Sequence, residues 1–421
     1  MMEEQLTVPE IRTLGLGYEI VWDDGVKITF DRLYDHRDYH IDAEITVIDT
    51  HDLNPHLIGP VRTSITKTFR SLITELEEAS AGRNWKGRLK QGTFYVLREH
   101  RKGQPVIKLS EQDAPERPPE RISGIAFEGM PTLIFGDGGM GKSTLGVAIL
   151  TYVQAGHNLG DTFQVVQGNC LVLDWEASWE ETYRRSNDVI RASDLHSDSM
   201  VYYRFCSAPL ETEVEFIRQQ ITELNISVVL VDSAGPACGG EPESASNTLK
   251  FFAALRSLAD SDRPVTTITL AHITKGGGGR NGPFGSVYWT NLPRNTFELK
   301  KAQKRGGNFI DLALHHRKTN IGTLREPVGL RMTWSDGIHL EPLDITKHAA
   351  LSERMSYPDK AEIALLETDP IDGSLVNPNG MSLEDLASYL NIFNESLLRT
   401  ALERDGRFEL EDGMWRFMLN F

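Results

Sequence analysis

Residues 131–144 read Pro131-Thr-Leu-Ile-Phe-Gly-Asp-Gly-Gly-Met-Gly-Lys-Ser-Thr144, and this stretch decides the fold. It opens with an apolar run of strand length, Thr132 to Phe135, and leads into a glycine-rich turn. From Leu145 to Val153 the chain continues with the apolar spacing of a buried helix. The turn matches the pattern G-x-x-x-x-G-K-S/T. The stretch therefore predicts a strand, a loop that wraps a phosphate chain, and a helix.

We expect this loop to bind the triphosphate of ATP. Glycine lets the backbone approach phosphate oxygens without a Cβ clash, and the start of the helix directs free N–H groups at that charge. Lys142 is expected to reach the β- and γ-phosphates and the Ser143 hydroxyl to ligate Mg²⁺. A chance match is disfavoured because the flanking strand and helix are also present. The predicted ATP-binding residues are Gly136, Asp137, Gly138, Gly139, Met140, Gly141, Lys142, Ser143 and Thr144.

Two later strands end in carboxylates, and acidic residues at the carboxyl ends of parallel strands mark the edge where chemistry takes place. Leu171 to Ala177 is the first of these strands and carries Glu176 near its end. The second, Ile226 to Ser233, places four consecutive apolar residues before Asp232. Downstream of a phosphate loop this is a Walker B strand. Asp232 is therefore expected to hold Mg²⁺, directly or through water.

A further strand runs from Val265 to Ala271 and ends at His272. The loop after it, residues 274–285, is too glycine-rich to pack into a core and carries the cations Lys275 and Arg280. We expect this loop to be mobile until a ligand binds it.

The strand-like and helical runs alternate from Ile122 to Leu343, which predicts a parallel sheet covered by helices. Residues 1–109 predict a separate α+β domain, with a hairpin turning at Asp23-Asp24-Gly25 and a helix over 63–79. The proline-rich residues 110–121 are expected to link these two domains.

A polar stretch, residues 344–358, is expected to link the central domain 122–343 to a third unit at 359–421. Helices capped by Ser382 and Asn394, followed by a hairpin, are typical of the winged-helix plan. The second capped helix carries both cations and carboxylates, so its charge does not decide whether this helix contacts DNA or another protein. Its charged residues are Arg399, Arg404, Glu395 and Glu403.

Composition limits the function classes. The 421 residues hold 44 Lys+Arg against 60 Asp+Glu, a formal net charge of −16, which argues against a protein that coats nucleic acid with its whole surface but leaves room for local basic loops. Cys170, Cys206 and Cys238 are widely spaced and indicate neither a disulfide framework nor a zinc site, so we expect a cytoplasmic setting. No run approaches the roughly 18 apolar residues of a membrane span, and we expect no membrane contact.

Taken together, these motifs resemble those of the RecA-like P-loop ATPases, an AAA-type ATPase domain. The resemblance is greatest to the branch that contains plasmid RepA and the DnaB-type hexameric helicases, and it covers residues 122–343. It rests on Gly136 to Thr144, Asp174-Trp-Glu-Ala177, Leu230-Val-Asp-Ser233, Ala271-His272 and Gly285-Ser286.

The resemblance implies roles for individual residues. Glu176, in preference to Asp174, would polarise the attacking water as the catalytic base. His272 would sense the γ-phosphate and relay its presence to the following loop. Lys275 and Arg280 in that loop would contact the phosphates of single-stranded DNA.

The same relatives carry a Lys-x-Arg motif on a late strand that reaches the nucleotide of the neighbouring subunit. This chain has Lys318-Thr-Asn320 there, with Arg317 shifted by one position. Either Arg317 or Lys318 is expected to offset the charge of the transition state, with Arg294 and Arg305 as alternatives.

The expected function is a Mg²⁺-dependent ATPase that assembles into a homo-oligomeric ring, with a hexamer as the expected form. It would act as a DNA helicase or DNA-dependent ATPase in replication or recombination. The alternative is a nucleotide-gated scaffold or regulator, in which ATP switches the 274–285 loop and the flanking domains recruit protein partners with little DNA contact.

Overall fold

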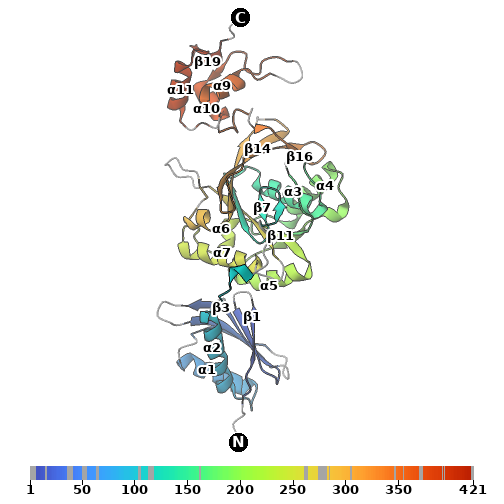
Figure 1. The fold of residues 1–421 in the computed structure, drawn as a ribbon, viewed down its shortest axis with the longest axis vertical. Coiled ribbons are helices and arrows are strands. Elements are labelled where there is room, and N and C mark those ends of the chain that lie inside the picture. The colour runs from blue at the N-terminus through green and yellow to red at the C-terminus, as the bar shows by residue number, and fades with distance from the viewer. Residues whose placement is uncertain are drawn as a thin grey trace.

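The computed structural model shows three units that follow one another along the chain (Figure 1). The N-terminal sheet and its helices lie at one end of the molecule, the large central sheet in the middle, and a small helical unit at the other end. The described residues are 6–14, 17–35, 41–49, 55–62, 66–102, 106–111, 118–160, 163–259, 264–273, 282–283, 285–303, 306–345, 348–353, 355–368, 373–390, 392 and 394–418.

The N-terminal unit is a five-stranded antiparallel sheet with two helices packed against it, and Trp22 and Trp85 are buried in its core. The predicted hairpin at Asp23-Asp24-Gly25 is confirmed: the Trp22 N–H donates to the Val26 carbonyl at 2.9 Å, and Gly25 takes a φ of 86°. The elements are β1 Glu10–Leu14, β2 Gly17–Val21, β3 Val26–Asp35, β4 Ile41–Asp49, β5 Pro55–Arg62, α1 Thr66–Ala79 and α2 Trp85–Lys102.

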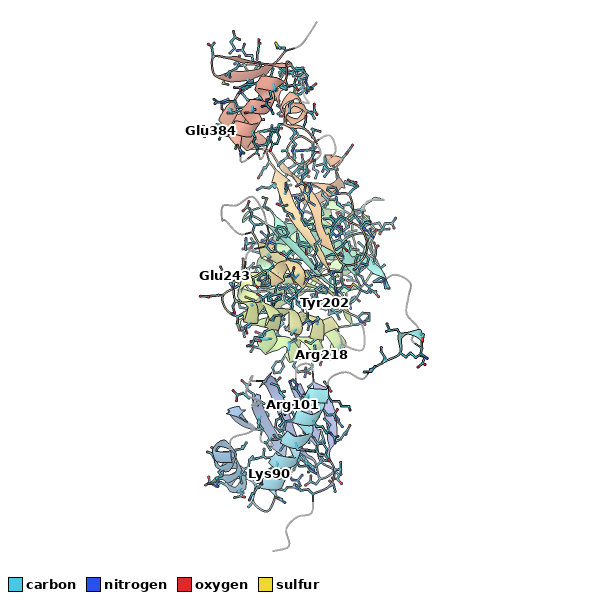
Figure 2. The ribbon with its side chains drawn as sticks, turned by 60° about the vertical axis from the view of Figure 1, so that its left-hand side comes forward. Lys90, Arg101, Tyr202, Arg218, Glu243 and Glu384 are labelled. Carbon is cyan, nitrogen blue, oxygen red and sulfur yellow. The ribbon has the colours of Figure 1, made fainter. Side chains whose placement is uncertain are left out.

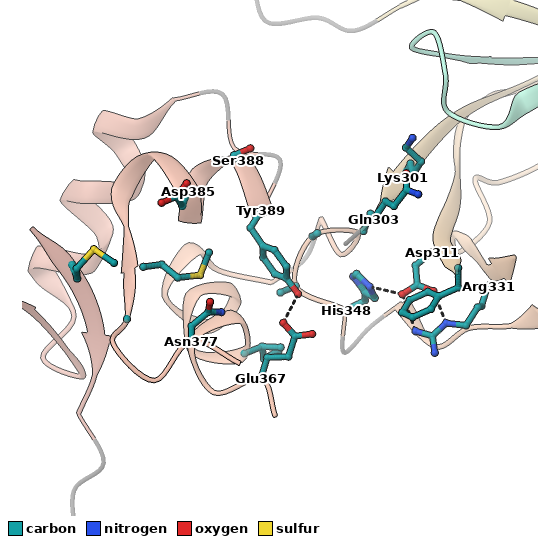
Figure 3. Close-up of a pocket in the computed structure, with 18 residues that line it drawn as sticks. Lys301, Gln303, Asp311, Arg331, His348, Glu367, Asn377, Asp385, Ser388 and Tyr389 are labelled. Carbon is teal, nitrogen blue, oxygen red and sulfur yellow. Dashed lines mark hydrogen bonds and ion pairs between the residues drawn. The ribbon is translucent and has the colours of Figure 1, made fainter. Parts of the chain in front are cut away.

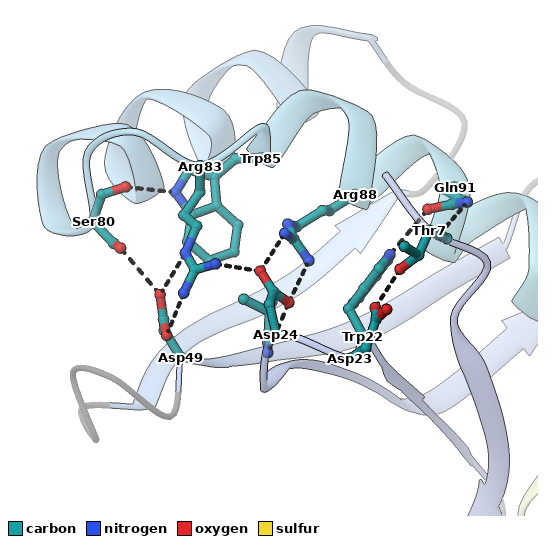
Figure 4. Close-up of polar contacts among 11 residues, drawn as sticks. Thr7, Trp22, Asp23, Asp24, Asp49, Ser80, Arg83, Trp85, Arg88 and Gln91 are labelled. Atoms are coloured by element: carbon teal, nitrogen blue, oxygen red, sulfur yellow. Dashed lines mark hydrogen bonds and ion pairs between the residues drawn. The ribbon is translucent and has the colours of Figure 1, made fainter. Parts of the chain in front are cut away.

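Two arginines hold the sheet to the helices (Figure 4). Arg88 lies near the start of the basic helix α2, and Arg83 lies just before it. Arg88 contacts both carboxylate oxygens of Asp24, at 3.1 and 2.6 Å. Arg83 bonds Asp24 as well and reaches Asp49 at 3.1 Å. These arginines are occupied in structural ion pairs, so the basic surface of α2 is made by other residues.

α2 runs along the length of its unit toward the central unit. Figure 2 shows Lys90 far from the central sheet and Arg101 at the end that approaches α5, the helix that carries Arg218.

The central unit is a nine-stranded sheet in the order β10-β9-β11-β12-β8-β13-β14-β15-β16. The six strands from β10 to β13 are parallel, as the sequence predicts, whereas β14, β15 and β16 extend the sheet with antiparallel pairs. The prediction of a parallel sheet up to Leu343 is therefore corrected for the last three strands. The strands are β8 Pro131–Gly136, β9 Asn169–Asp174, β10 Tyr202–Phe205, β11 Ile226–Asp232, β12 Thr266–His272, β13 Asn295–Ala302, β14 Phe309–Thr319, β15 Val328–Trp334 and β16 Ile338–Pro342.

Helices cover both faces of this sheet. α3 and α4 pack on one face through residues such as Leu145 and Val189, and α5 and α7 pack on the other through Val214 and Phe251. The helices are α3 Lys142–Ala155, α4 Trp179–Ala192, α5 Leu210–Glu223, α6 Ala234–Ala237, α7 Ala245–Ala259 and α8 Tyr288–Asn291. Short elements precede β8 or join α4 to β10: η1 Leu109–Glu111, β6 Glu120–Ile122, β7 Ala126–Phe127 and η2 Ser197–Ser199.

The C-terminal unit has three helices and a small antiparallel sheet in the order β17-β19-β18. The predicted caps are confirmed, because the Ser382 and Asn394 side chains accept hydrogen bonds from the N–H groups of Asp385 and Leu397. The winged-helix plan itself stays a prediction. The elements are α9 Tyr357–Leu365, β17 Met381–Ser382, α10 Leu383–Tyr389, α11 Glu395–Arg404, β18 Phe408–Glu411 and β19 Met414–Phe417.

The sequence predicts a linker over 344–358, between the central sheet and α9, and described residues of this segment contact β14. Ile345 and Leu351 are buried in a small cluster with Ala313. Glu353 forms an ion pair with Arg317, which also lies on β14. The connection therefore joins the two units by packing and charge as well as by the chain itself.

No helix within the described residues combines the length and apolar character that crossing a lipid bilayer would need.

Candidate nucleotide site

The glycine-rich loop lies between β8 and α3, as the sequence predicts. Gly139 and Gly141 take φ values of 72° and 87°, in the left-handed region that residues with a Cβ rarely adopt. Gly141 caps α3, so the first free N–H groups of that helix face the interior of the loop. The backbone thus presents a concave set of donors of the kind that binds phosphate.

Lys142 lies across the inside of this loop. Its Nζ donates to the carbonyls of Gly136 and Asp137 at 2.9 and 2.8 Å, and lies 3.5 Å from Nδ1 of His272. Burial lowers the pKa of the Lys142 ammonium, and neighbouring carboxylates, Asp232 first, partly offset that effect. An arriving polyanion would supply the opposite charge that this buried cation requires.

Ser143 and Asp232 meet beside the loop through a side-chain hydrogen bond. Asp232 ends β11 in a buried position, and this burial raises the pKa of its carboxyl to about 6, with Asp174 and Glu176 adding to the rise. A divalent cation would favour the ionised form that burial disfavours. A hydroxyl and one carboxylate are oxygen ligands that suit Mg²⁺, which is usually held by one or two protein groups plus substrate phosphates.

The two carboxylates after β9 have different surroundings. Asp174 is buried, and its Oδ1 accepts the N–H groups of Glu176 and Ala177, both at 2.9 Å, so that it shapes the turn. Glu176 is exposed, and its Oε1 accepts a hydrogen bond from the Ser233 hydroxyl. Water can therefore reach Glu176 but not Asp174.

His272 completes this edge, because it ends β12 directly beside Gly136 of β8. Burial lowers the pKa of its imidazole, and the nearby Lys142 ammonium lowers it further. The structure thus brings together Lys142, Ser143, Glu176, Asp232 and His272 at the carboxyl ends of four adjacent parallel strands.

The two cations predicted on the late strand lie elsewhere. Lys318 pairs with Thr296 near the start of β13, and its Nζ donates to the carbonyls of Asn291 and Pro293. Since Asn295 lies opposite Thr132, this is the edge of the sheet away from the loop. A role for Lys318 in catalysis would therefore have to be played at the site of another subunit. Arg317 is held instead by Glu298 of β13 and by Glu353. Lys275, Arg280 and Arg305 lie outside the described residues.

Two contacts at the site were not predicted. Lys301, from β13, donates through Nζ to the carbonyl of Gly139 at 2.8 Å. Ser233 holds Glu176. Both contacts join segments that are far apart in the sequence. The sequence features that could have indicated them are the cluster of cations at 300–305 and the serine directly after Asp232.

An ion-pair network surrounds Arg317. Its guanidinium bonds Glu298 of β13 and reaches Glu353 from the segment before α9, with Nη1 2.8 Å from Oε2 of Glu353. Lys300 also bonds Glu353, at 2.6 Å. The pKa of Glu353 lies well below its usual range, mainly because the Arg317 guanidinium donates hydrogen bonds to its carboxylate. His315 lies beneath this network, with Nδ1 3.6 Å from Glu353.

The buried His315 predicts a pH dependence of stability. Burial lowers the pKa of its imidazole to about 4, against 6.5 for the free side chain. Between these values the unfolded chain binds a proton that the folded chain does not, so stability falls as the pH drops below 6.5. Between pH 7.5 and pH 5.8 the loss from this residue should be about 1 kcal/mol.

Urea unfolding at these two pH values, with wild type and His315→Gln in parallel, measures this effect. The variant should lose about 1 kcal/mol less than wild type on acidification. His196→Gln, at an exposed site with 78% of its side chain accessible, is the matched control and should behave as wild type. Equal losses in wild type and His315→Gln would show that His315 does not cause the dependence.

Comparison with known proteins agrees with this geometry. Residues 98–278 match the family model of the AAA domain. A search of curated proteins found no match. The matched segment contains the phosphate loop, Glu176, Asp232 and His272, and it supports a domain of the P-loop ATPase type, for which nucleotide binding and ATP hydrolysis are the indicated activity.

Proposed function

We propose that the protein binds ATP on residues 136–144 and hydrolyses it, coupled to single-stranded DNA, as a ring-forming ATPase of the RepA/DnaB helicase type. The observation that carries the ATPase part is the convergence of five functional side chains on one edge of the parallel sheet. They are Lys142, Ser143, Glu176, Asp232 and His272.

Each side chain has a role that its position supports. Lys142 exchanges its two carbonyl contacts for phosphate oxygens, with the gain of an opposite charge. Ser143 and Asp232 would hold Mg²⁺, which neutralises phosphate charge when bound. Glu176 accepts a proton from the attacking water and is held in place by Ser233. His272, 3.5 Å from Lys142, registers whether that lysine is engaged with phosphate.

The DNA and ring parts of the proposal rest on the resemblance and on the cations Lys275 and Arg280. Arg317 or Lys318 would serve the site of a neighbouring subunit. The alternative, a nucleotide-gated scaffold with little DNA contact, is favoured by the net charge of −16 and by the mixed charges of α11.

Lys142→Ala tests the proposal directly. It should abolish detectable ATP binding in calorimetry, because the triphosphate loses the cation that its charge requires, and should abolish turnover with it. Lys90→Ala, an exposed lysine on α2, is the matched control and should leave both unchanged. ATP affinity that survives in Lys142→Ala would contradict the site.

Turnover with and without single-stranded DNA separates the two functions. The helicase-type ATPase predicts stimulation by DNA that disappears in the Lys275→Ala/Arg280→Ala double variant. The scaffold predicts slow turnover that DNA does not change.

A further inference from the structure

A cleft of about 1020 Å³ lies between the β13–β15 end of the central sheet and the helices of the C-terminal unit (Figure 3). Lys301, Asp311 and Arg331 line it from the sheet, and Tyr389 and Asn377 line it from the C-terminal unit. Nucleotide-sized ligands occupy pockets of about 300–1,000 Å³. The cleft is therefore large enough for the nucleoside part of ATP.

The cleft begins beside the phosphate loop. Lys301 lines it and at the same time donates to the Gly139 carbonyl at the tip of the loop. Gly141, at the other end of the loop, faces the next strand, because a Cβ built there would lie 3.3 Å from Cδ1 of Ile310. The β13–β14 hairpin thus runs along the loop.

This hairpin also extends past the carboxyl end of β8, where the phosphate loop begins. The pairing of β13 with β8 ends at Glu298 and Phe135, yet β13 continues to Ala302. Four further residues of strand correspond to about 13 Å. A triphosphate bound in the loop leaves its ribose and base outside the loop, and the hairpin offers them a wall on that side.

The lining of the cleft suits a base and a ribose. Tyr389, 38% exposed, and Phe309 supply aromatic rings from opposite walls. One face of Phe309 is covered by the Arg331 guanidinium, 4.2 Å from the ring centre. Stacking on aromatic side chains is the usual way in which proteins bind bases without reading their sequence.

The charged groups on the sheet side are already paired, which leaves polar atoms for a neutral ligand. Asp311 accepts two hydrogen bonds from Arg331, at 2.7 and 2.9 Å, and lies 3.1 Å from Nε2 of His348. The Nδ1 atom of His348 is buried and has no hydrogen-bond partner among the described residues. With Nε2–H directed at the carboxylate, Nδ1 is left as an acceptor, and a ribose hydroxyl or exocyclic amine would reach it only with a shift of the His348 ring, because the atom is buried.

We propose that this cleft holds the base and ribose of the ATP whose phosphates lie on residues 136–144, so that the C-terminal unit forms part of the nucleotide site. The proposal rests on the proposed function. A bound nucleotide then contacts both units and favours the arrangement in which the cleft is closed around it.

The test compares two ligands that share the phosphate chain. The dissociation constants of Mg–ATP and of Mg–tripolyphosphate, which has no base or ribose, are measured by calorimetry on the full chain. Tyr389→Ala should weaken ATP about tenfold, the loss expected for one stacked base, and leave tripolyphosphate unchanged. Tyr202→Ala, on the edge strand β10 away from the cleft, is the matched control and should change neither.

Photolabelling of the wild-type protein with 8-azido-ATP tests the same proposal without any substitution, so the result does not depend on whether a variant folds correctly. The label should appear on peptides that contain Tyr389 or Phe309. Label confined to other peptides, or ATP affinity unchanged in Tyr389→Ala, overturns the proposal while the proposed function stands. Failure of the wild type to bind either ligand would overturn both.

Discussion

Glu176→Gln is expected to lower ATP turnover by about a hundredfold to ten-thousandfold, the range that a positioned general base contributes, while ATP affinity stays within about twofold of wild type. Glutamine keeps the shape of glutamate and can still accept the Ser233 hydroxyl that Glu176 accepts. It cannot take a proton from water. The loss should therefore appear in the rate and not in binding.

Turnover under saturating ATP and calorimetric binding, each with and without single-stranded DNA, measure the two effects. Glu223→Gln, an exposed carboxylate at the end of α5, is the matched control and should behave as wild type. Wild-type turnover in Glu176→Gln would remove it as the base. A parallel loss of ATP affinity would indicate a binding role instead.

Arg317→Ala is expected to lower turnover by about a thousandfold, if the guanidinium acts at the site of a neighbouring subunit. The same substitution is expected to lower the free energy of unfolding by about 2 kcal/mol. This loss is smaller than the one expected for breaking a fully buried ion pair, because Arg317 is partly exposed to solvent. The stability loss has a visible cause, since Glu298 is only 5% exposed and would lose the cation that it contacts.

Glu353→Gln separates these two roles of Arg317. It removes one carboxylate partner of the guanidinium but leaves the guanidinium and Glu298 in place. Turnover in this variant should match or exceed that of wild type, because Arg317 is freer to move. Both variants are assayed for turnover and for urea unfolding at a concentration that gives a single species in light scattering. Wild-type turnover in Arg317→Ala would leave Arg317 a purely structural role.

The sequence predicts best where chemistry and local structure coincide. The strand, loop and helix over 131–155 are readable because a phosphate loop needs its glycines, its lysine and its helix start within a few residues. The same holds for the turn at Gly25 and for the caps Ser382 and Asn394, which depend on neighbours within three residues.

The missed features depend on pairing across long distances. Lys301 meets Gly139 only because β13 lies beside β8, a pairing of segments 162 residues apart. The burial of Ile345 and Leu351 was missed for a related reason. The few apolar side chains around them show no periodicity, and the burial of both residues depends on β14, with which they share no local pattern.

The contacts that Ile345, Leu351 and Glu353 make with β14 distinguish the C-terminal connection from the N-terminal one. The described residues 106–111, before the central unit, expose Val106, Ile107 and Leu109 instead of burying them in either neighbouring core. In this described part of the connection, apolar packing of the kind seen at Ile345 and Leu351 is therefore absent. By contrast, a rotation of the C-terminal unit would be transmitted through Glu353 to Arg317 on β14.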